Sequence, residues 1–88
     1  MPLMSMISEN RIVNAIGDYD LPMTVAQIAE ATDMSNAGTR RALQRLEDAR
    51  YIYRSALIAR PACYCLTDYG VLLYQTFKDI SKMEIPEI

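Results

Sequence analysis

Residues 21–52, LPMTVAQIAEATDMSNAGTRRALQRLEDARYI, carry the signals that decide the fold. Thr24 and Gln27 stand three residues apart at the start of a short apolar-periodic segment, and this spacing predicts a capping box at the beginning of a helix. The segment "ATDMS" ends that helix, and Ser35 is placed to cap the next one. The stretch therefore predicts two short helices joined by a tight turn.

The second of these helices, predicted over residues 35–49, has two unlike faces. Small and apolar residues recur at spacings of three and four and predict a buried stripe of Thr39, Ala42, Leu43 and Leu46. The opposite face is predicted to be exposed to solvent, and it carries Asn36, Ala37, Arg40, Arg41 and Gln44.

Charge is sorted along the chain. Although the net charge is −2, six of the seven arginines lie within residues 33–60, where only three acidic residues accompany them. This leaves three of the nine basic and eight of the eleven acidic residues for the rest of the chain. A solvated helix face needs no such sorting, whereas a surface that meets a polyanion does.

The flanking segments complete the predicted order of elements. Residues 5–17 predict a first helix that buries Met6, Ile12, Val13 and Ile16, with Gly17 and "DYDLP" ending it. After Ala49 the apolar pattern changes to a period of two. The segments "YIYRSAL" and "ACYCL" then predict a two-stranded hairpin whose core-facing residues are Ile52, Tyr64 and Leu66.

Thr67 is placed to cap a last helix that runs to about Met83. The apolar residues of that helix cover more than one face, which predicts a second packing surface. Together with the methionine-rich start of the chain, this surplus predicts a homodimer built from the first and last helices.

Composition excludes several classes of protein. Eighty-eight residues predict one small domain, 1–88, and no run approaches the roughly 20 apolar residues of a membrane span. Cys63 and Cys65 are expected to be free thiols in a reducing cytoplasm rather than a disulfide or a metal site. With no histidine and no glycine-rich phosphate loop, we expect neither an enzyme nor a bound cofactor.

The order of elements resembles the winged helix-turn-helix domain of prokaryotic transcriptional regulators, such as the MarR-like, ArsR-like and PadR-like families. Two motifs carry the likeness, residues 21–52 and "YCLTDYG", and with the first helix it covers roughly residues 10–80. The resemblance implies a mainly α fold with a small β-hairpin, in the order α-α-α-β-β-α. Two positions depart from the family pattern: Arg50 stands where glycine is common, and Thr39 where valine or isoleucine is usual.

The resemblance also implies a function. In such domains the recognition helix enters the major groove of double-stranded DNA while the wing contacts the backbone. Transferred residue by residue, the predicted contacts come from the helix at 35–49 and from arginines flanking the wing: Ser35, Asn36, Ala37, Arg40, Arg41, Gln44, Arg54 and Arg60. The alternative is a winged helix that binds another protein and no DNA, which the acidic remainder and the short apolar wing would suit.

Overall fold

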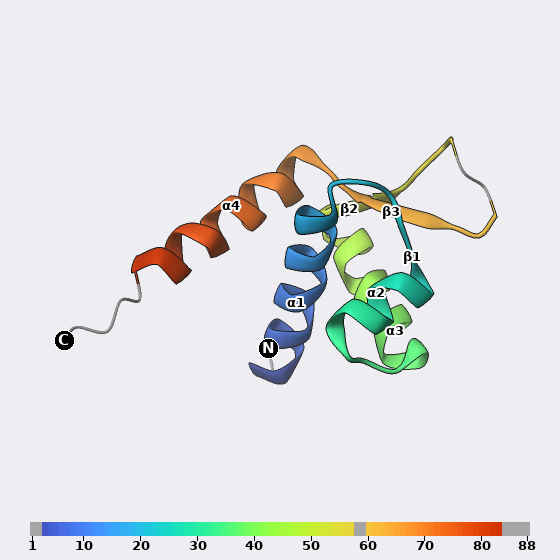
Figure 1. Ribbon diagram of the computed structural model, residues 1–88, viewed down its shortest axis with the longest axis horizontal. Coiled ribbons are helices and arrows are strands. Elements are labelled where there is room, and N and C mark those ends of the chain that lie inside the picture. Colours follow the sequence, from blue (N-terminus) through green and yellow to red (C-terminus); the bar gives the residue numbers. More distant parts are fainter. Residues whose placement is uncertain (1–2, 58–59, 84–88) are drawn as a thin grey trace.

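The computed structural model describes residues 3–57 and 60–83, with side chains described for residues 8–57 and 60–79. Three helices form a bundle beneath a small sheet; the wing extends to one side and the last helix to the other (Figure 1). The elements are α1 (Leu3–Tyr19), β1 (Met23–Thr24), α2 (Val25–Thr32), α3 (Asn36–Asp48), β2 (Ile52–Arg54), β3 (Cys63–Leu66) and α4 (Asp68–Met83). This is the predicted winged helix-turn-helix.

Helix α1 is longer than the sequence predicted, because Gly17 does not end it. A Cβ atom at Gly17 would lie 2.4 Å from the ring of Tyr74, so the glycine serves a close approach between α1 and α4. The helix ends instead at Asp20, whose φ is 61° and whose N–H donates to the carbonyl of Ile16 at 3.1 Å.

The sheet has three strands rather than the predicted two. β1 pairs antiparallel with β3, which also pairs with β2, so that the order is β1-β3-β2. The third strand forms where Met23 is buried in the core: it lies opposite Tyr64 of β3 and is 3% exposed. Two residues before a helix carry no alternating pattern, and the sequence therefore did not reveal this strand.

The core lies between the three-helix bundle and the sheet. Its fully buried side chains include the predicted stripe of α3, and the predicted Ile52 and Tyr64 of the hairpin are buried as well. Leu66 is only partly buried, although it packs against the core. The hydroxyl of Thr39 is fully buried and has no hydrogen-bond partner among the described residues, so this departure from valine or isoleucine still fills an apolar site. The predicted burial of the Met6 side chain lies outside the described residues.

Arg50 occupies a left-handed position, with φ of 69°, immediately after α3. Its N–H donates to the carbonyl of Glu47, and the N–H of Tyr51 donates to that of Leu46, each at 3.0 Å. This pair of bonds is a Schellman motif, which usually has glycine at the position of Arg50. The chain thus turns from α3 into β2 with a residue at the turn that is less favourable there than glycine.

Thr67 joins α4 to the corner between α3 and β2. Its hydroxyl accepts a hydrogen bond from the N–H of Gly70 at 3.0 Å, which confirms the predicted cap, and donates to the carbonyl of Arg50 at 2.6 Å. Its own N–H donates to the carbonyl of Tyr51 at 3.0 Å. The motif "LTDYG" therefore positions the first turn of α4 on the corner that joins α3 to β2.

A second contact ties α4 to α1. The Asp18 carboxylate accepts a hydrogen bond from the Tyr74 hydroxyl at 2.5 Å and lies 3.1 Å from the Lys78 ammonium group. The bond from Tyr74, followed by that from Lys78, lowers the pKa of the Asp18 carboxyl. Because that pKa is lowered on folding, the contact stabilises the fold at neutral pH and is lost only in acid.

Candidate nucleic-acid interface

A cavity of about 530 Å³ lies between the start of α2, the outer face of α3 and the base of the wing. We call it the α3–wing groove. It brings together side chains that are far apart in the sequence: Thr24, Val25, Ala26, Arg40, Gln44, Glu47, Arg54, Pro61, Ala62 and Tyr64.

Helix α3 contributes Arg40 and Gln44, which stand one turn apart on its exposed face. Among the described side chains, no acidic group lies within 4 Å of Arg40 or of its neighbour Arg41. The Gln44 amide donates to the Asp48 carboxylate at 3.0 Å. The guanidinium of Arg40 is thus free for an anion or a base edge in the groove.

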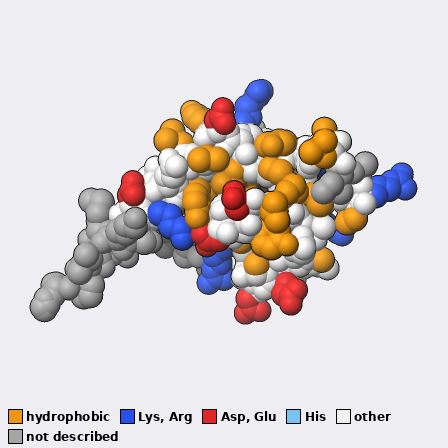
Figure 2. All heavy atoms as spheres, turned by 45° about the horizontal axis from the view of Figure 1, so that its top comes forward, with side chains coloured by type: hydrophobic (Ala, Val, Ile, Leu, Met, Phe, Trp, Pro, Cys, Tyr) orange, Lys and Arg blue, Asp and Glu red, His pale blue; other side chains and the backbone are white. Residues whose placement is uncertain are grey.

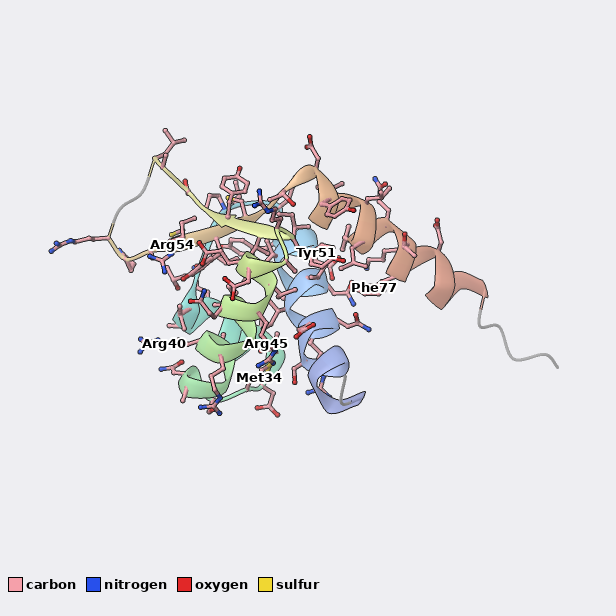
Figure 3. The ribbon with its side chains drawn as sticks, turned by 180° about the vertical axis from the view of Figure 1, so that it is seen from behind. Met34, Arg40, Arg45, Tyr51, Arg54 and Phe77 are labelled. Atoms are coloured by element: carbon pink, nitrogen blue, oxygen red, sulfur yellow. The ribbon has the colours of Figure 1, made fainter. Side chains whose placement is uncertain are left out.

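Strand β2 contributes Arg54, because side chains alternate along a strand and Arg54 shares a face with the buried Ile52. That face continues beyond the core into the groove. The register sets Arg54 opposite Tyr64, and its guanidinium carbon lies 5.9 Å from the centre of the Tyr64 ring. Figure 3 shows Arg40 and Arg54 on the same side of the molecule.

The start of α2 adds backbone donors to the groove. The first N–H groups of a helix have no acceptor within it, and they carry a partial positive charge. The predicted capping box is present: the Gln27 N–H donates to the Thr24 hydroxyl at 3.1 Å, and the Gln27 side chain accepts from the Thr24 N–H at 2.9 Å. Val25 and Ala26, which follow the cap, line the groove. A helix start of this kind is a favourable place for a phosphate.

The remaining predicted contact residues lie outside the groove. Ser35 caps α3 by accepting the Gly38 N–H at 3.0 Å, so its hydroxyl has a structural role. The other residues are exposed but do not line the groove: Asn36, Ala37, Arg41 and Arg60.

Among the described side chains, Arg45 is paired with neither of its neighbours in α3, Glu47 and Asp48. Arg45 pairs with Glu9 of α1 at 2.7 Å, on the side of α3 that faces α1 (Figure 3). Glu47 lines the groove, where its carboxylate lies 3.8 Å from Arg54. Neither contact could be predicted from the sequence, because the first depends on how α3 packs against α1 and the second on how β2 lies beside α3.

Sequence reasoning also missed Tyr64 and the start of α2 as groove residues. Tyr64 was assigned to the core, and it is indeed 7% exposed, yet one side of its ring borders the groove. The strand register would have revealed its pairing with Arg54, but only once the hairpin turn was known.

In the described part of the chain, no three histidine, cysteine or acidic residues are grouped as a metal ion would require. Cys63 is buried and Cys65 partly exposed, and both are free thiols. Over the same residues, none of the helices is long and apolar enough for a membrane crossing.

Comparison with known families identifies the fold. Residues 8–57, more than half of the sequence, match the model of the MarR family. The chain belongs to the MarR family. The matched segment runs from α1 through β2 and therefore includes both helices of the helix-turn-helix. A comparison with curated protein sequences finds no match.

Solved structures agree with this assignment. The MarR-family transcriptional regulator SPO1453 from Silicibacter pomeroyi superimposes with a TM-score of 0.78 at 21% identity over 88% of this chain and 54% of that protein. MepR, a regulator of the Staphylococcus aureus multidrug efflux pump MepA, has a TM-score of 0.77 at 24% identity over 88% and 58%. MepR in complex with DNA gives 0.73 at 24% identity over 88% and 65%. This MarR-family chain thus spans only part of each of these relatives.

Proposed function

We propose that this MarR-family protein is a cytoplasmic transcriptional regulator, not an enzyme, and that it binds double-stranded DNA through the α3–wing groove. The observation that carries the proposal is the convergence of Arg40, Arg54 and the start of α2 on one concave surface. The solved complex of MepR with DNA supports it, since that protein has the same fold.

In this proposal α3 lies in the major groove of DNA. Arg40 and Gln44 are exposed at the middle of the helix, and such side chains pair with guanine and adenine edges respectively. Asn36, Ala37 and Arg41 stand nearer the start of the same exposed face. Arg54, Arg60 and the first amides of α2 would hold phosphates, which position the protein without reading sequence.

DNA binding is tested with duplexes from the region upstream of the protein's own gene and with shuffled duplexes of equal length. We expect the upstream duplex to bind at least tenfold more tightly at physiological salt. For both duplexes, log K should fall with log salt by about 0.9 per phosphate contact. If no duplex binds in a salt-dependent manner, the protein-interaction alternative takes the place of this proposal.

We further propose that the protein acts as a homodimer through α1 and α4. Large apolar side chains remain exposed at the end of α1, just beyond it, and in the first turns of α4: Tyr19, Leu21, Tyr69, Val71 and Leu72. Figure 2 shows hydrophobic side chains gathered on one face of the molecule. The contact of Tyr74 and Lys78 with Asp18 holds α4 against α1.

Sedimentation at micromolar concentration tests the dimer. We expect a species of twice the 10.0 kDa chain mass, because an exposed apolar face of this kind is stabilised by burial. Leu72→Asp should shift the protein towards monomer without loss of helical signal, since Leu72 is 59% exposed. A parent protein that sediments as a monomer would contradict the dimer while leaving the DNA proposal intact.

A further inference from the structure

The α3–wing groove contains an acidic side chain, which is unexpected in a surface proposed to bind a polyanion. Glu47 lines the groove together with Arg40 and Arg54, and its carboxylate Oε2 lies 3.8 Å from Arg54 Nε. The Glu47 side chain is 33% exposed and that of Arg54 is 59% exposed. Phosphates approaching Arg54 would therefore come close to this carboxylate.

The charge of Glu47 is unfavourably placed within α3. The residue lies in the last turn, where the helix dipole is negative and an acidic side chain is unfavourable. Asp48 beside it accepts a hydrogen bond from Gln44, whereas the ion pair of Glu47 is with Arg54. The favourable electrostatic interaction of Glu47 is therefore made across the groove, to the wing.

Arg54 is held from two sides. Tyr64 lies beneath its guanidinium, at 5.9 Å from ring centre to guanidinium carbon, and Glu47 lies at its edge. At 3.8 Å the ion pair is longer than a hydrogen bond, so it orients Arg54 without a fixed donor–acceptor geometry. A phosphate that binds the Arg54 guanidinium must compete for it with the Glu47 carboxylate.

We propose that Glu47 is a positioning residue for Arg54 and lowers the affinity of the groove for every DNA duplex. In the free protein Glu47 compensates the charge of Arg54 and keeps it over Tyr64. DNA binding has to displace that interaction, whatever the sequence. This inference rests on the proposed function, and it assigns to Glu47 a restraint on phosphate binding that acts through Arg54.

The test replaces Glu47 with glutamine, which keeps the size of the side chain and removes its charge. An exposed ion pair of this kind corresponds to about a three- to fivefold change in affinity, so Glu47→Gln should tighten binding to shuffled and upstream duplexes by that factor. The salt slope should steepen by up to about 0.9 per protomer, because Arg54 then neutralises a phosphate fully. A purely structural role would not change this slope.

Asp48→Asn is the matched control, because it removes the same charge from the neighbouring position without touching the ion pair. We expect its affinity to stay within about twofold of the parent. Equal gains in the two variants would mean that net charge alone is responsible, and would overturn the inference.

The second arm repeats Glu47→Gln in an Arg54→Gln background. If Glu47 acts through Arg54, the gain in affinity and the change in salt slope both disappear there. A gain that persists would show direct repulsion between Glu47 and phosphates, and no gain or a loss in the single variant would also overturn the inference. Failure of the proposed function is a separate result, since then the parent and Glu47→Gln would both fail to bind any duplex.

Discussion

Replacing Gly70 with alanine should lower the free energy of unfolding by about 3 kcal/mol, the largest stability change that we expect from one added methyl group. A Cβ atom at Gly70 would lie 2.0 Å from the carbonyl oxygen of Tyr51 and 3.2 Å from Leu66 Cβ. The first contact is with backbone, which cannot rotate away as a side chain can. Helix α4 would have to move off the corner between α3 and β2.

That movement breaks several contacts at once, because Thr67 makes three hydrogen bonds at the same corner. Chemical denaturation followed by circular dichroism measures the change. Gly38→Ala is the control, since a Cβ atom there would meet only the Ser35 hydroxyl at 3.1 Å. We expect that variant to change stability by less than about 1 kcal/mol, as helix propensity favours alanine. If the two variants were equally stable, α4 would not rest on this corner.

Arg40→Ala should cost about 1–3 kcal/mol of binding free energy on the preferred duplex and relax the preference at one base pair of each half-site. Arg40 lines the α3–wing groove, is exposed, and has no acidic group within 4 Å among the described side chains. Its removal should therefore leave the unfolding free energy nearly unchanged. Binding titrations on the preferred duplex and on its single-base variants measure both effects.

Arg54→Ala should change DNA binding in a different way. It should weaken binding to all duplexes by about the same factor and reduce the salt slope by at most about one unit per protomer. The reduction should be below one unit because Glu47 already compensates part of the charge of Arg54.

Arg45→Ala is the control for both variants. Its pairing with Glu9 places it away from the groove, so DNA affinity should stay within about twofold of the parent. If Arg40→Ala and Arg54→Ala bind as the parent does, the groove is not a DNA surface.

Much of the fold follows from local chemistry that the sequence displays. Thr24, Ser35 and Thr67 each stand at the start of a helix, and all three caps are present because a hydroxyl at such a position satisfies an otherwise unpaired N–H. The buried stripe of α3 follows in the same way from the helical period. These signals operate over three or four residues, which is why they can be interpreted without a tertiary structure.

The sequence predicted only part of the candidate site. Spacing along α3 predicted its exposed face, including Arg40 and Gln44, but it could not tell which acidic residue lies near which arginine. Arg45 pairs with Glu9, 36 residues away. Arg54 lies opposite Tyr64 in a strand register that the sequence of so short a hairpin does not predict. These contacts depend on how elements cross.

The sequence by itself therefore determined the order of the helices, their caps and the solvent-exposed face of α3, because each rests on periodicity and on hydrogen bonds between near neighbours. The tertiary structure alone decided the third strand, the close approaches at Gly17 and Gly70, and the meeting of Arg40, Glu47, Arg54 and the start of α2 in one groove. Those features arise from packing between distant segments, and packing distances are set by the whole core rather than by any local pattern.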